Sequence, residues 1–163
     1  RRRVGKFEQC GDGTLLLDKR EKLLPNLAYT DLKGVFSLTG DLGLEWKHNA
    51  WISYTRNDFT LTFSQIYRGG YRNGWLPRIS SPNVSATRPD YNERVDPYHI
   101  YNFSVSQQFG ERFKLTAGVR NIFDTDPPFA ITYDTDTGTG SSWEPRVADP
   151  RGRSFTLAVE ARF

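Results

Sequence analysis

The residues best suited to chemistry are two histidines, one cysteine and an acidic run, and they do not combine into a site. His48 and His99 lie near the starts of different expected strands, and a metal ion needs more ligands than this pair supplies. Cys10 has no partner for a disulfide or a thiolate cage. Asp134-Thr-Asp-Thr-Gly138 begins like a calcium loop, but Pro145 stands where that pattern requires its glutamate. Nucleophile-elbow, phosphate-loop and zinc-protease motifs are also missing, so we expect no enzyme, no metal and no cofactor.

Aromatic side chains in loop-like stretches are the other candidates for a binding role. Four of them could stack on a solute: Tyr71, Trp75, Tyr91 and Trp143. The same side chains could instead form an aromatic girdle or pack within their own loops, and the sequence leaves both roles open.

The last nine residues indicate which element must position such loops. Apolar side chains occupy the odd positions, which are Phe155, Leu157, Val159, Ala161 and Phe163, and polar or small ones the even positions. This period of two predicts a strand with one apolar face. At about 3.3 Å per residue and a tilt of about 40°, it would climb about 22 to 25 Å, close to the apolar band of an outer-membrane barrel. An edge strand of a soluble sheet is the alternative.

Similar alternation predicts further strands upstream. We expect strands at Lys33–Thr39, His48–Thr55, Phe59–Arg68, Tyr98–Phe109 and Phe113–Phe123. Short turns at Arg56–Asp58 and Gly110–Arg112 alternate with long connections at Gly69–Pro97 and Asp124–Pro150. Barrels of the outer membrane have short periplasmic turns and longer extracellular loops, so the long connections are expected outside.

Composition limits the remaining choices. Aromatic residues make up 14% of the 163 residues, yet no apolar run approaches the ~18 residues of a membrane helix. The net charge of +3 is small and the basic residues are scattered among acids, which argues against a nucleic-acid partner. The absence of methionine and of a secretory start favours a piece of a longer chain, with any export signal elsewhere.

Several blocks of residues resemble the TonB-dependent receptors, specifically the C-terminal part of their barrel. They include Trp46-Lys-His-Asn-Ala50, Tyr67-Arg-Gly-Gly-Tyr-Arg72, Val95-Asp-Pro-Tyr98, Leu115-Thr-Ala-Gly-Val-Arg-Asn-Ile-Phe-Asp124, Asp126-Pro-Pro-Phe129 and Ala148-Asp-Pro-Arg-Gly-Arg153. The motif residues are Asn121, Phe123, Asp124, Pro127, Pro128, Asp149, Pro150, Arg151, Gly152 and Arg153. At strand ends, Asn121 and Asp124 could cap backbone groups, the prolines end pairing, and the arginines could meet phosphates or loop carboxylates.

The resemblance implies an all-β fold of antiparallel transmembrane strands, with residues 33–163 as the C-terminal fragment of a plugged barrel of about 22 strands. Residues 1–32 stay unassigned. It also implies a place in the bacterial outer membrane and contacts with lipid, the barrel assembly machinery and the TonB energy-coupling complex. The assembly machinery would read the last strand, so its odd-numbered residues from Phe155 to Phe163 are the expected assembly signal. The activity implied is energised uptake of a scarce solute such as a ferric siderophore, cobalamin or a glycan. A passive porin-like channel and a soluble carbohydrate-binding module are the alternatives.

Overall fold

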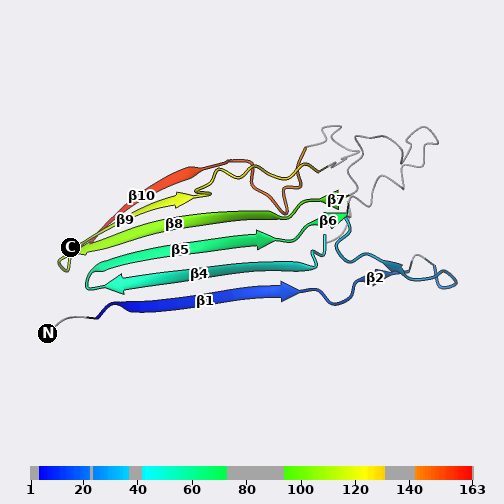
Figure 1. Cartoon of the computed structure of the whole chain (residues 1–163), viewed down its shortest axis with the longest axis horizontal. Helices are drawn as coiled ribbons and strands as arrows, with labels where there is room; N and C mark the ends of the chain where they lie inside the picture. Colours follow the sequence, from blue (N-terminus) through cyan, green and yellow to red (C-terminus); the bar gives the residue numbers. More distant parts are fainter. Residues whose placement is uncertain (1–3, 23, 37–41, 73–93, 131–141, 163) are drawn as a thin grey trace.

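The computed structural model describes residues 4–22, 24–36, 42–72, 94–130 and 142–162. Its main element is an antiparallel sheet in which six strands follow the order β1-β4-β5-β8-β9-β10 (Figure 1). The strands are β1 (Lys6–Leu15), β4 (Trp46–Arg56), β5 (Phe59–Arg68), β8 (Tyr98–Phe109), β9 (Phe113–Arg120) and β10 (Ser154–Ala161). Two small hairpins pair β2 (Arg20–Glu21) with β3 (Thr30–Asp31), and β6 (Tyr71–Arg72) with β7 (Arg94–Val95). Within the described ranges, no helix is both long and apolar enough to cross a bilayer.

The two ends of the sheet differ in how the strands are joined. At one end, Asn57 and Asp58 link β4 to β5, and residues 110–112 link β8 to β9. Asn57 and Gly110 adopt positive φ angles of 54° and 61°, which tight turns between antiparallel strands require. The described parts of the longer connections, with β2, β6 and β7, lie at the opposite end, to the right in Figure 1, which we call the loop end. The predicted alternation of turns and long connections is thus present.

The sheet has one apolar face and one polar face, because successive side chains in a strand point to opposite sides. The register aligns one apolar row across five strands: Ile52, Phe63, Phe103, Val119 and Phe155. A neighbouring row on the other face contains Ser53, Thr62, Ser104, Gly118 and Thr156. Phe155, Leu157 and Val159 are 74%, 72% and 67% exposed. An apolar face this open is unusual for a monomeric soluble protein.

Two upstream parts of the sheet differ from the sequence prediction. Residues 6–15, which the sequence analysis left unassigned, form the full-length strand β1, which pairs with β4. The strand expected at 33–39 is wrong over its described residues: Gly34 turns the chain with a φ of 60°, and Val35 makes only an isolated bridge to Arg72. β9 also ends at Arg120 and not at Phe123, because Asn121 has a φ of 55° and leaves the extended conformation.

The buried core lies at the loop end, on the polar face. It joins strand residues Tyr98 and Ile100 to residues of the connections, namely Phe36, Leu42, Tyr71, Val95, Ala130, Val147 and Ala148. Since these residues come from separate connections, their packing fixes the bases of the connections against the sheet.

Candidate functional site

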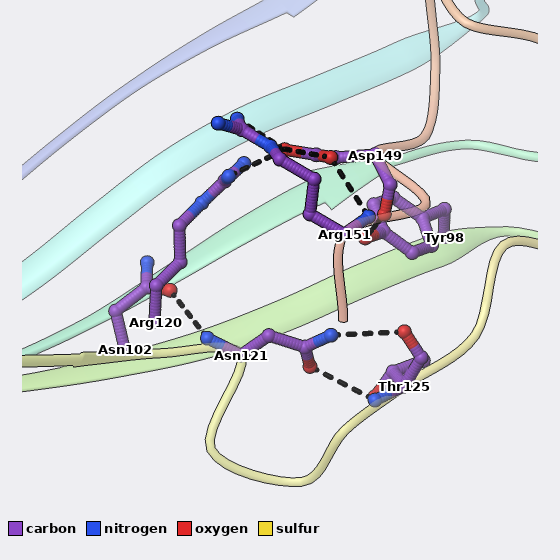
Figure 2. A network of polar contacts seen from close by, with 7 residues as sticks. All are labelled: Tyr98, Asn102, Arg120, Asn121, Thr125, Asp149 and Arg151. Carbon is purple, nitrogen blue, oxygen red and sulfur yellow. Dashed lines mark hydrogen bonds and ion pairs between the residues drawn. The ribbon is translucent and has the colours of Figure 1, made fainter. Parts of the chain in front are cut away.

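The carboxylate of Asp149 is the centre of a polar network at the loop end (Figure 2). Arg120, the last residue of β9, donates from Nη1 to Asp149 Oδ2 at 2.5 Å. Arg151 donates from Nη2 to the same oxygen at 2.6 Å and from Nε to both oxygens at 3.0 Å. The hydroxyl of Tyr98 donates to the backbone carbonyl of Asp149 at 3.3 Å. One residue therefore ties the connection before β10 to both β8 and β9.

Electrostatics keep this carboxylate charged. The side-chain hydrogen bonds of Arg151, then its backbone N–H, and then Arg120, hold the pKa of Asp149 far below its usual range. Side-chain exposure is 22% for Asp149 and 75% for Arg151, so the pair is partly screened by solvent. The network holds the connection before β10 against the sheet and has no arrangement for catalysis, since no nucleophile or base lies beside it among the described residues.

Asn121 organises the chain immediately after β9. It is 2% exposed and sits in the left-handed region, which asparagine tolerates better than most residues. Its side chain accepts from Thr125 N and donates to Thr125 O, both at 2.9 Å, while its own N–H donates to Asn102 Oδ1 at 3.0 Å. Asp124 Oδ1 accepts from Arg153 N at 2.7 Å, so the two motif residues do cap backbone groups.

Gly152 explains why the motif contains a glycine. Its φ is +66°, and an added Cβ would lie 3.0 Å from Asp124 Oδ1. A side chain here would be strained and would crowd the carboxylate that caps the start of β10.

The other motif residues are placed as follows: Phe123 lies edge-on to Tyr101 with centroids 5.5 Å apart, Pro127 and Pro128 are half-buried after β9, and Pro150 is exposed before β10.

A second ion pair lies within the connection before β10. Glu144 is 5% exposed and accepts from Arg146 N, Nε and Nη2. Burial raises the pKa of Glu144, but the hydrogen bonds and charge of Arg146 outweigh that effect and lower it overall. Burial and the nearby Glu144 charge raise the pKa of Tyr71, whose hydroxyl has no hydrogen-bond partner among the described residues.

Of the four aromatic solute candidates, the structure describes two. Tyr71 is 3% exposed within the buried core, so its ring is closed to a solute in this arrangement. Trp143 is half-buried, and Trp75 and Tyr91 lie outside the described residues, as does Phe163. Solute contact by this set stays a prediction. The remaining residues of the expected assembly signal, Phe155 to Ala161 at odd positions, lie together on the apolar face of β10.

A cationic recess on the polar face was not identified from the sequence. It consists of two adjoining hollows of about 400 and 330 Å³ that share Arg68, Arg146 and Val147. Its charged lining residues are Asp12, Lys47, Arg68, Arg120, Arg146 and Asp149. Arg68 donates to Asn49 Oδ1 at 3.3 Å, and Asn49 donates to Asp12 Oδ2 at 3.1 Å. Four cationic side chains line this recess against two carboxylates, and Glu144 pairs with one of the four, Arg146. The balance of charge stays positive, which favours anions.

No described group of three or more His, Cys, Asp or Glu residues is arranged to hold a metal ion. The sequence signal for the recess was present but scattered, since Lys47 and Arg68 occupy polar-face positions of β4 and β5 that only the register brings opposite each other.

Comparison with solved structures identifies the fold. The chain resembles the ferric enterobactin receptor PfeA of Pseudomonas aeruginosa, in a glycine-to-valine variant, with a TM-score of 0.56 and 16% identity over 96% of this chain. A double variant of PfeA gives 0.52 and 18% over 82%, and a variant in complex with enterobactin gives 0.50 and 19% over 72%. The sequence matches no protein-family model and no curated protein.

These likenesses support the fold class predicted from the sequence. The chain is all-β and antiparallel, and it has the fold of a stretch of barrel wall from a receptor of the TonB-dependent type, with the barrel not closed. It spans about one fifth of the length of the first receptor, or 20%.

Proposed function

We propose that this chain forms part of the barrel wall of an outer-membrane receptor that takes up a scarce solute with energy supplied through TonB. The observation that carries the proposal is a continuous antiparallel sheet with one open apolar face, in a chain of which 96% matches the structure of a ferric enterobactin receptor. The neighbouring proteins are receptors, which agrees with a role in binding and transport and not in catalysis.

The two faces suggest how such a wall sits in a membrane. The apolar face would contact acyl chains, and the polar face with its cationic recess would line the lumen. The loop end would then lie outside the cell and the two short turns in the periplasm. Glu160 lies on the polar side of β10, away from the acyl chains, and Arg162 follows the strand at its short-turn end. Near the interface a charge on the lipid side costs only about 0 to 1 kcal/mol, compared with about 2 to 4 kcal/mol for an arginine at the midplane.

Within this proposal, the solute is an anionic iron chelate of the siderophore class. The balance of charge in the recess, set by Lys47, Arg68, Arg120 and Arg146, favours an anion over a neutral glycan. The plug, which would contact both the solute and TonB, lies outside this chain. The barrel assembly machinery would insert the wall, with the odd-numbered face of β10 as part of its signal.

Uptake measured in cells tests the proposal. The intact receptor should restore accumulation of radiolabelled ferric siderophore in a strain that lacks its own siderophore receptors, and removal of TonB should abolish it. Replacing Lys47 and Arg68 with glutamine should weaken uptake, while Lys22→Gln, an exposed residue outside the recess, should leave it unchanged.

Three results would redirect the proposal. Uptake that continues without TonB would indicate a passive channel. Uptake of cobalamin or a glycan, with no response to ferric siderophores, would keep the receptor but change its solute. A protein that stays in solution without detergent and binds carbohydrate would indicate the soluble module.

A further inference from the structure

A directional chain of hydrogen bonds runs across the apolar face. The Trp46 indole N–H donates to His48 Nδ1 at 2.8 Å, so that nitrogen is an acceptor and Nε2 carries the ring proton. His48 Nε2 then donates to Gln65 Oε1 at 3.1 Å, and Gln65 Nε2 donates to the Tyr101 hydroxyl oxygen at 2.9 Å. The bonds all point the same way, which strengthens each through polarisation. This series of hydrogen bonds ends at the Tyr101 hydroxyl, whose proton has no acceptor among the described residues.

The Tyr101 ring is held in place from three sides. Phe63 stacks on it at 5.6 Å between centroids, while His99 and Phe123 contact it edge-on at 5.9 and 5.5 Å. Such fixed geometry aims the hydroxyl and does not leave it free to seek a partner elsewhere.

A hollow of about 510 Å³ includes both Gln65 and Tyr101 in its lining. The other lining residues include two small ones, Gly11 and Ala50, together with Gln9, Cys10, Trp51, Ile52 and Phe63. The volume lies within the range of small-molecule pockets. The lining contains no lysine, arginine or carboxylate, so the group that it recognises is neutral.

We propose that this hollow binds one membrane lipid, with a stretch of acyl chain against Gly11 and Ala50 and an ester or amide carbonyl accepting the Tyr101 proton. This inference rests on the proposed function, which places the apolar face in the bilayer. Water is scarce at that depth, and an unpaired donor there is costly, so a lipid carbonyl is the available acceptor. A phosphate does not fit, because no cation faces the hollow.

The series of hydrogen bonds from Trp46 to Tyr101 also connects this site to the loop end. Trp46 begins β4 there, and Gln65 pairs with Ala50, four residues further along β4. That separation is about 13 Å along a strand. Trp and Tyr favour the interfacial region of a bilayer. The hydrogen bonds would therefore run from headgroup level to the inner edge of that region, where lipid carbonyls border the acyl chains.

Lipid binding by the intact receptor tests the inference. The receptor is purified in dodecyl maltoside and titrated with ester-linked dioleoylphosphatidylethanolamine or with its ether-linked analogue, which lacks the carbonyls, and the single-lipid adduct is quantified by native mass spectrometry. The wild-type receptor should prefer the ester lipid by about twofold to tenfold, as expected for one hydrogen bond. Tyr101→Phe, which keeps the ring, should bind both lipids equally.

A matched pair of substitutions tests the hollow. Ala50→Leu fills it and should remove the tight adduct, whereas Ala117→Leu, on the same face but outside the hollow, should keep it. Equal binding of ester and ether lipid by the wild-type receptor, or equal losses in both leucine variants, overturns the inference. A receptor that inserts into membranes but shows no preference for the ester lipid refutes the lipid site alone. A receptor that fails to insert refutes both the lipid site and the proposed function. Loss of TonB-coupled uptake with the ester preference intact refutes only the transport role.

Discussion

Leu157→Arg should destabilise the receptor far more than Ala158→Arg, although the two residues are adjacent. Leu157 lies in the middle of β10, pairs with Ala117 and is 72% exposed on the apolar face. Arginine there would place its charge in the acyl region, at a cost of about 2 to 4 kcal/mol near the midplane. Ala158 pairs with Thr116 on the polar face, where an added arginine should change stability by only about 0.5 kcal/mol.

Depth supplies an internal scale for this experiment. Val159 is two residues nearer the short-turn end than Leu157, which is about 6.6 Å along the strand and about 5 Å of depth at a tilt of about 40°. Because the cost of a charge falls toward the interface, Val159→Arg should destabilise by about 1 to 3 kcal/mol. The order of the three variants is the prediction, with Leu157→Arg the most destabilising.

The measurement is equilibrium unfolding by guanidinium chloride of the intact receptor folded into phosphocholine vesicles, followed by tryptophan fluorescence. Each variant is compared with wild type at the same lipid ratio. A loss for Ala158→Arg that equals or exceeds the loss for Leu157→Arg would mean that the faces are exchanged, since a one-residue slip moves every side chain to the opposite side.

Three further results are expected. Asp149→Asn should lower the free energy of unfolding by about 1 to 2 kcal/mol at pH 7. Wild type should lose stability as the pH falls below about 4, because a carboxylate with a lowered pKa stabilises the fold only while it is charged, and the variant should lose less. Equal dependence of stability on pH in the two proteins would contradict this. In cells whose receptor lacks its native cysteine, cysteines at Asn83 and Gly138 should react with an impermeant maleimide and one at Glu111 should not; the reverse pattern would invert the topology. Deleting Phe163 should lower the amount of heat-modifiable barrel in the outer membrane, and unchanged amounts would remove it from the assembly signal.

The strands that the sequence predicted correctly are those with complete alternation. β5 and β8 have the predicted bounds, because Phe59 to Tyr67 and Tyr101 to Phe109 place large apolar residues on one face at nearly every second position. The final strand was visible for the same reason.

β1 could not be predicted because it has few large apolar side chains on its apolar face. Between Phe7 and Leu15, that face presents only Gln9, Gly11 and Gly13. The strand is specified by its partner: Phe7 packs against Tyr54 at 4.7 Å between ring centroids, and the Trp46 ring lies where a side chain on Gly13 would stand, 2.8 Å from an added Cβ. The periodicity of residues 6–15 does not predict this strand, because side chains of the neighbouring strand β4 cover its small residues.

The site was predictable only in part. The motif around Asp149 placed a carboxylate beside two arginines, and the structure adds the contact with Arg120, 29 residues earlier in the chain. The buried core at the loop end and the cationic recess draw on several connections at once, so no local pattern marks them.

The core at the loop end also sets how the connections can change over evolutionary time. One long connection is closed at its base by the pairing of Tyr71 with Val95, and the other by a hydrogen bond from Ala130 N to Ser142 O at 2.9 Å. A segment with its ends already held together adds only a slowly growing entropic cost when it lengthens. A change of length within either connection should therefore leave its base and the adjoining sheet intact, so segments of other lengths can be inserted there by design.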